Sequence, residues 1–120
     1  MSLINAPTEY QESVTFHQWL QFRHIRHTHI PNENGRNSAM RGAMNKRMGV
    51  SKGFPDFLVF VDGKCLAIEL KRRQGGSVSP EQREWLKVLA AHGFECGIAR
   101  GASEAIKFVS KYIRKETVEI

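Results

Sequence analysis

The clearest pattern in the chain is a pair of apolar runs separated by Asp62-Gly63. The first run spans residues 57–61, and the second spans residues 64–71, where charged residues stand only near the ends. Asp-Gly between two such runs predicts a β-hairpin, because both central residues of a type I′ turn need a positive φ. Positions 66–68 and 70 are apolar on both faces of the second strand, which is typical of a central strand covered on both sides.

Helical and extended patterns alternate through much of the rest of the chain. Apolar spacing predicts helices over residues 8–21, 38–48, 79–92 and 102–115, and strands over residues 22–30 and 94–100. The third helix starts with Ser79-Pro80-Glu81-Gln82, a capping-box arrangement with Pro at the first helical position. This order predicts an α/β domain with a mixed central β-sheet flanked by helices, in which the last strand lies beside the second hairpin strand.

Residues 32–53 form a polar, basic segment that is rich in Gly and Asn. Met40, Met44 and Met48 recur there at every fourth position, and this spacing predicts a packing stripe on a short helix. Long irregular connections in compact domains are often functional. We therefore expect this segment to contact a substrate.

Two carboxylates and one ammonium group are predicted to meet at one end of the hairpin. Asp56 stands just before the first strand, while Glu69 and Lys71 share one face of the second. Antiparallel pairing about Asp62-Gly63 places Asp56 opposite the neighbourhood of Glu69. Carboxylates are rarely buried without a partner or a metal. The pattern therefore predicts either a divalent-cation site beside a phosphodiester or a purely structural ion pair.

Composition narrows the class of protein. The 120 residues predict a single domain over residues 1–120, and no apolar stretch approaches the roughly 20 residues of a membrane span. The first residues lack the basic and apolar regions of a secretory signal. We expect a cytoplasmic protein of a phage or bacterium, in which Cys65 and Cys96 are reduced core residues.

The net charge of +6 points toward a polyanionic partner such as DNA. The basic residues cluster before Asp56 and after Glu69 instead of spreading evenly. Contacts from such clusters to phosphates would give binding that is independent of base sequence. The residues expected to bind DNA are Arg36, Arg41, Lys46, Arg47, Lys52, Arg72 and Arg73.

Three motifs follow one another along the chain, namely Gly53-Phe54-Pro55-Asp56, Glu69-Leu70-Lys71 and Ser79-Pro80-Glu81-Gln82. Together with the basic segment of residues 32–53, they resemble the virus-type replication-repair nuclease (VRR-NUC) domain of the PD-(D/E)XK nuclease superfamily. The resemblance extends over nearly the whole chain. It implies a restriction-endonuclease-like core and a Mg²⁺-dependent deoxyribonuclease.

The resemblance also implies an acidic residue on the first helix, for which we favour Glu9 over Glu12. The implied catalytic residues are Asp56, Glu69, Lys71, Gln82 and Glu9. The implied metal ligands are Asp56, Glu69, the backbone carbonyl of Leu70, and Glu9, and such an all-oxygen set suits Mg²⁺ or Mn²⁺. Lys71 would stabilise an attacking hydroxide or the transition state. Gln82 would orient Lys71 or a water, or would serve only as a helix cap.

Small stand-alone members of this family resemble Holliday junction resolvases, so the resemblance implies a homodimer that cuts four-way DNA junctions. Flap cleavage and exonuclease trimming by the same fold remain open alternatives. From other classes, a non-catalytic DNA-binding module would keep the basic residues without metal dependence. A zinc protein would use His27 and His29, but no cysteine pair at zinc spacing accompanies them.

Overall fold

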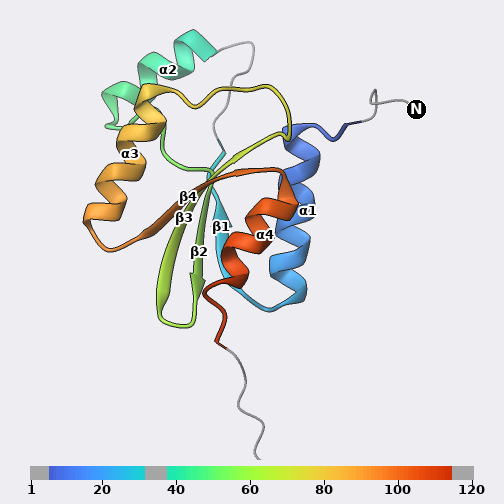
Figure 1. Cartoon of the computed structure of the whole chain (residues 1–120). Helices are drawn as coiled ribbons and strands as arrows, with labels where there is room; N and C mark the ends of the chain where they lie inside the picture. Colours follow the sequence, from blue (N-terminus) through green and yellow to red (C-terminus); the bar gives the residue numbers. More distant parts are fainter. Residues whose placement is uncertain (1–5, 32–37, 115–120) are drawn as a thin grey trace, which may run out of the picture.

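A computed structural model of the chain describes residues 6–31 and 38–114. The elements are α1 (Glu9–Phe22), β1 (Arg26–His29), α2 (Ser38–Arg47), β2 (Phe57–Val61), β3 (Lys64–Lys71), α3 (Pro80–Ala91), β4 (Glu95–Arg100) and α4 (Ala102–Ser110). Figure 1 shows α1 and α4 on one side of the sheet and α3 on the other. None of the described helices is long and apolar enough to cross a membrane.

The four strands form one mixed sheet in the order β1-β2-β3-β4. Strands β2 and β3 pair antiparallel around Asp62 and Gly63, whose φ angles are both positive, at 46° and 83°. After the α3 crossover, β4 pairs parallel with β3. The predicted hairpin and the predicted mixed α/β fold are therefore confirmed.

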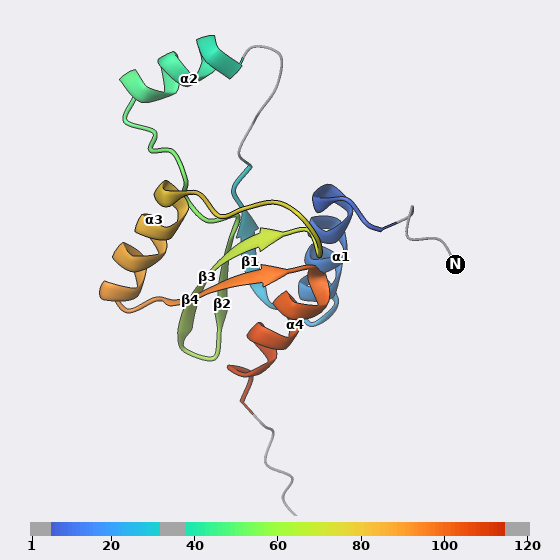
Figure 2. The ribbon, with the colours of Figure 1, turned by 45° about the horizontal axis from the view of Figure 1, so that its top comes forward.

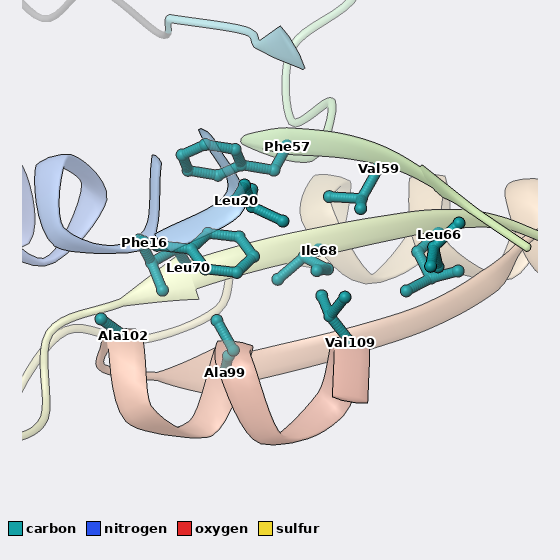
Figure 3. Close-up of a cluster of buried hydrophobic side chains, with 12 residues drawn as sticks. Phe16, Leu20, Phe57, Val59, Leu66, Ile68, Leu70, Ala99, Ala102 and Val109 are labelled. Atoms are coloured by element: carbon teal, nitrogen blue, oxygen red, sulfur yellow. The ribbon is translucent and has the colours of Figure 1, made fainter. Parts of the chain in front are cut away.

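The apolar core lies between the sheet and the pair of helices α1 and α4 (Figure 3). Phe16 and Leu20 of α1 are fully buried, and the Phe16 ring meets the Phe57 ring of β2 edge to face with centroids 4.9 Å apart. Burying one such side chain fully contributes about 1.5–3 kcal/mol to stability. Residues 66–70 of β3 are buried on both faces, so β3 is a firmly held central strand that presents Glu69.

The sequence pattern misplaced two boundaries. The first strand is confined to Arg26–His29, because α1 continues to Phe22 and a turn follows in which His24 has a φ of 57°. The last helix ends at Ser110 instead of near residue 115, which itself lies outside the described residues. Both errors fall at element ends, where local apolar spacing carries little information.

The prediction that the three methionines pack against another part of the chain is wrong for the residues that the structure describes. Met40, Met44 and Met48 are all exposed, and α2 makes no extensive contact with another described helix or strand. A Cβ atom added at Gly42 of α2 would meet nothing within 4 Å. Figure 2 shows α2 standing apart from the strands. The spacing of the methionines correctly predicted a helix, but it did not indicate whether another part of the chain covers them.

Candidate active site

Asp56 and Glu69 face each other across the end of the β2–β3 hairpin. The register pairs Phe57 with Ile68, and one further step brings Asp56 opposite Glu69. The Oδ2 atom of Asp56 accepts a hydrogen bond of 2.7 Å from the backbone N–H of Leu70. Asp56 is 7% exposed and Glu69 is 1% exposed. The hairpin therefore holds two buried carboxyl groups side by side.

Lys71 and Gln82 both approach the same oxygen of Glu69. The Nζ atom of Lys71 lies 3.5 Å from Glu69 Oε2, and the lysine side chain is 12% exposed. The Nε2 atom of Gln82 donates a hydrogen bond of 3.0 Å to that oxygen. Since an ammonium group has three donors, one contact with Glu69 leaves Lys71 able to donate to another acceptor.

The Gln82 amide also caps α3. Its Oε1 atom accepts a hydrogen bond of 2.9 Å from the Ser79 N–H, while the Gln82 N–H donates to Ser79 Oγ at 3.1 Å. These two bonds are the predicted capping box. Because Oε1 is used by the cap, Nε2 is the end of the amide that faces Glu69. The capping contact and the contact with Glu69 therefore coexist.

Gly53 allows the loop before Asp56 to pass close to the first turn of α3. Its φ is +93°, and an added Cβ atom would lie 2.7 Å from the Glu81 carbonyl carbon and 2.9 Å from the Gln82 nitrogen. Only glycine tolerates both the angle and the approach. The next residue, Phe54, packs its ring edge to face on Trp85 at 5.0 Å. The segment that leads to Asp56 therefore packs closely against α3, the helix that carries Gln82.

Burial controls the ionisation of both carboxyl groups. Loss of solvation, followed by the repulsion of Asp56, raises the pKa of Glu69 to about 8, although Lys71 opposes the shift. Loss of solvation also raises the pKa of Asp56, against the lowering effect of the Leu70 N–H. In the described part of the chain, no donor reaches the buried Oε1 atom of Glu69. Without a cation, the pair is therefore poised to retain a proton.

A divalent cation fits this donor set. Asp56 and Glu69 supply carboxylate oxygens, one of which is buried without a donor. The Leu70 carbonyl points to the same side of β3 as its N–H, which meets Asp56. Oxygen ligands alone suit Mg²⁺ or Mn²⁺. Within residues 6–31 and 38–114 no group of three or more His, Cys, Asp or Glu side chains gathers, so water and a substrate phosphate would complete the shell, as is usual for Mg²⁺.

The two acidic residues of the first helix have different surroundings. Glu9 is exposed in the first turn of α1, and no third acidic side chain joins the Asp56–Glu69 pair in the described residues. Glu12, by contrast, is 2% exposed. Its carboxylate accepts 2.9 Å bonds from Arg73 Nε and from the Ala102 N–H at the start of α4. The structure therefore does not bring Glu9 to the carboxylate pair, and it gives Glu12 a structural contact.

The residues expected to bind DNA are exposed wherever the structure describes them. They are Arg41, Lys46 and Arg47 on α2, Lys52 in the following loop, and Arg72 and Arg73 after β3. The Nε atom of Arg73 is engaged by Glu12. Arg36 lies outside the described residues. The structure thus places basic side chains on α2 and on the loop that leaves the carboxylate strand.

Arg100 is a contact residue that the sequence did not reveal. Its guanidinium group donates bonds of 2.7 Å to the Gly75 carbonyl and 3.0 Å to the Gly76 carbonyl. In the parallel register Arg100 stands beside Lys71. It therefore fixes the loop that leads from Lys71 to the capping box of α3. No local sequence pattern indicates this contact, because it joins the last residue of β4 to loop residues that stand 24 and 25 positions earlier in the chain.

Comparison with known proteins adds to this geometry. A model of the VRR-NUC domain family matches residues 7–103. A solved structure described as a VRR_NUC domain protein is similar over 92% of this chain and 91% of that chain, with 25% sequence identity and a TM-score of 0.72. No curated protein matches the chain. The family match extends from α1 to the start of α4 and therefore includes every part of the site described above.

Proposed function

Since the chain belongs to the VRR-NUC domain family, whose function is nuclease-type DNA processing, we propose that it is a Mg²⁺-dependent endonuclease acting on structured DNA. The observation that carries this proposal is the buried Asp56–Glu69 pair beside Lys71. Burying two neighbouring carboxyl groups is costly unless a partner or a metal compensates. A site of this kind is expected where catalysis needs perturbed acidic groups.

The proposed roles follow from the contacts of each side chain. Asp56 and Glu69 bind the cation, with the Leu70 carbonyl as a further ligand. When bound, Mg²⁺ supplies Lewis-acid stabilisation of the phosphate and lowers the pKa of a water ligand. Gln82 holds the Glu69 carboxylate in place through its 3.0 Å bond. Lys71 donates to the attacking water or to the negative charge that develops on the phosphate.

Glu9 stays a proposed further ligand, although the structure places it on an exposed turn. A Glu9→Ala variant tests this role without disturbing the core. A large loss of cleavage would support it. Cleavage at the wild-type rate would remove Glu9 from the site.

A four-way DNA junction is the proposed substrate, and a homodimer is the proposed form of the enzyme. A two-fold dimer carries two sites and can cut two strands of a two-fold junction. Exposed basic residues such as Arg41, Lys46 and Arg72 would bind phosphates without reading bases. Flap cleavage or exonuclease trimming would use the same site. A non-catalytic DNA-binding module is disfavoured, because phosphate binding alone does not require a buried carboxylate pair.

The test is cleavage of end-labelled four-way junction, flap and linear duplex DNA, each in Mg²⁺ and in EDTA. We expect paired cuts on opposite strands of the junction in Mg²⁺ and none in EDTA. Preferential cutting of the flap or the duplex would keep the chemistry but replace the substrate. Salt-sensitive binding of all three DNAs without any cleavage would contradict the proposed enzyme and support the binding module.

A further inference from the structure

The helix α2 presents an apolar stripe that the described part of the chain does not cover. Met40, Met44 and Met48 are 70%, 58% and 70% exposed. Met48 follows the last helical residue, and its N–H still bonds to the Met44 carbonyl at 3.1 Å. Methionine side chains are flexible and polarizable, and they are frequent at protein-binding surfaces. A stripe with this spacing is the anchor pattern of a helix that lies in a groove.

Basic residues border the methionine stripe of α2. At 3.6 residues per turn, Arg41 and Arg47 fall on either side of Met44, whereas Lys46 falls on the opposite face. The helix has no acidic residue. A surface that receives this stripe should therefore have an apolar floor and an acidic rim.

A groove with these properties lies on α3 of the same chain. It has a volume of about 290 Å³ and is lined by Trp85 and Val88 together with Lys52, Glu81 and Glu84. Glu81, Glu84 and Val88 are exposed on one face of α3. The groove thus offers the apolar side chains of Trp85 and Val88 beside two carboxylates and one lysine. Its apolar part complements the methionines of α2, and its two carboxylates complement the arginines beside them.

We propose that α2 of one copy of this chain docks in the α3 groove of a second copy, and that the two copies exchange these helices about a two-fold axis. In such an isologous interface the same pair of surfaces is used twice. The two carboxylates at the rim disfavour DNA as the occupant, because they repel phosphates. The inference rests on the homodimer in the proposed function, but it requires neither metal nor DNA.

The test is sedimentation of the full chain over a concentration series, without DNA or metal. The helix variant is Met44→Glu, which places a carboxylate against the acidic rim. The groove variant is Glu81→Lys/Glu84→Lys, which repels Arg41 and Arg47. The matched control is Lys46→Glu, on the opposite face of α2. All of these side chains are exposed, and circular dichroism checks that each variant is folded.

The wild-type chain and the control are expected to form dimers. The dimer dissociation constant of each of the two variants is expected to rise at least about tenfold, because like charges in an interface cost several kcal/mol. Mixing the two variants should restore a dimer, since one interface is then native and the other pairs the carboxylate introduced on α2 with the lysines introduced on α3. A monomeric wild type, or a dimer that survives both variants, would overturn the proposal. A third result would also overturn it: the mixture of the two variants stays dissociated, and the dimer returns only when the α2 change and the α3 changes are combined in one chain. That result would place α2 on the groove of its own chain.

The outcomes separate this proposal from the proposed enzyme. Mass is measured without substrate, so an absence of cleavage does not affect the result. A monomeric wild type that still cuts DNA in Mg²⁺ would contradict the α2–α3 interface and leave the chemistry standing. A dimer of the expected kind that cuts no DNA would support the interface and contradict the nuclease.

Discussion

The carboxyl group of Glu69 is buried in a position where its ionised form is unfavourable. The side chain is almost completely enclosed, it lies beside Asp56, and one of its oxygens has no donor in the described part of the chain. A group in such a position destabilises the fold when it ionises without a compensating cation. The proposed metal binding requires the ionised form of Glu69, whereas the stability of the metal-free fold favours the protonated form. Such a trade-off between activity and stability is common at catalytic sites.

The first prediction concerns the pH dependence of stability in the metal-free protein. The pKa of Glu69 is about 8 in the folded chain, against an ordinary value of 4.5. A raised pKa stabilises the fold when the group is protonated, so this contribution is complete below about pH 4.5 and is lost as the pH rises to about 8. The free energy of unfolding, measured with urea in EDTA, should fall across that window.

Glu69→Gln is the matched control for this prediction, because it keeps the shape of the side chain and removes its titration. Its free energy of unfolding should change much less with pH, and at pH 8 it should exceed that of the metal-free wild type. Mg²⁺ should stabilise the wild type at pH 8 and leave the variant unaffected. Parallel pH profiles for the two proteins would contradict the assignment of the shift to Glu69.

The second prediction separates the two tasks of Gln82. Gln82→Glu keeps an oxygen that can accept from the Ser79 N–H, but it replaces the donor to Glu69 with a carboxylate. Cleavage should fall by at least about tenfold, because Glu69 loses its donor and faces a like charge. Ser79→Ala removes only the cap, and it should cost about 1 kcal/mol of stability with a much smaller effect on cleavage. Equal effects of the two changes on cleavage would assign Gln82 a purely capping role.

At the scale of elements, the site depends on how closely the loop before β2 approaches α3. Gly53 and Gly49 have nearly the same φ, at +93° and +90°, but only Gly53 touches α3. Gly53→Ala should therefore destabilise the protein more than Gly49→Ala, since both add backbone strain of about 1–3 kcal/mol and only the first also collides with Glu81 and Gln82. Thermal unfolding and cleavage rates measure the difference. Equal losses for the two variants would show that the close approach is unimportant.

Local patterns allowed most of the elements to be predicted from the sequence. The Asp62-Gly63 turn and the capping box at Ser79 are signals within four residues, and both were found where expected. The contacts of Glu12 with Arg73 and with the Ala102 N–H join residues 61 and 90 positions apart. No local pattern encodes such pairs. For the same reason, spacing predicted the α2 helix but not the exposure of its methionines.

At the scale of the whole molecule, the carboxylate pair stands between two sets of supporting contacts. The cap of α3 reaches Glu69 through Gln82, on one side. Glu12 ties the start of α4 to Arg73, just after β3, and the Gly101 N–H donates a 2.7 Å bond to the Lys71 carbonyl. The candidate site is therefore held by helices from both faces of the sheet.

A fourth prediction follows from the distribution of charge over the molecule. With a net charge of +6 and exposed arginines on α2 and after β3, DNA affinity should fall steeply as salt increases. Arg72→Ala should weaken binding to junction and duplex DNA similarly and reduce the salt slope by about one. Fluorescence anisotropy across a salt series measures both quantities. A loss confined to one base sequence would contradict binding through phosphates.

The proposed role of the Asp56–Glu69 pair is to bind the Mg²⁺ that DNA hydrolysis requires. The decisive experiment measures single-turnover cleavage and DNA affinity together for wild type and Asp56→Asn in Mg²⁺. Asn keeps the shape of the side chain but removes a charged ligand. Since metal catalysis contributes several kcal/mol, we expect the variant to lose cleavage by about a hundredfold or more, with DNA affinity unchanged or slightly higher. Cleavage by Asp56→Asn at the wild-type rate would contradict the proposed role.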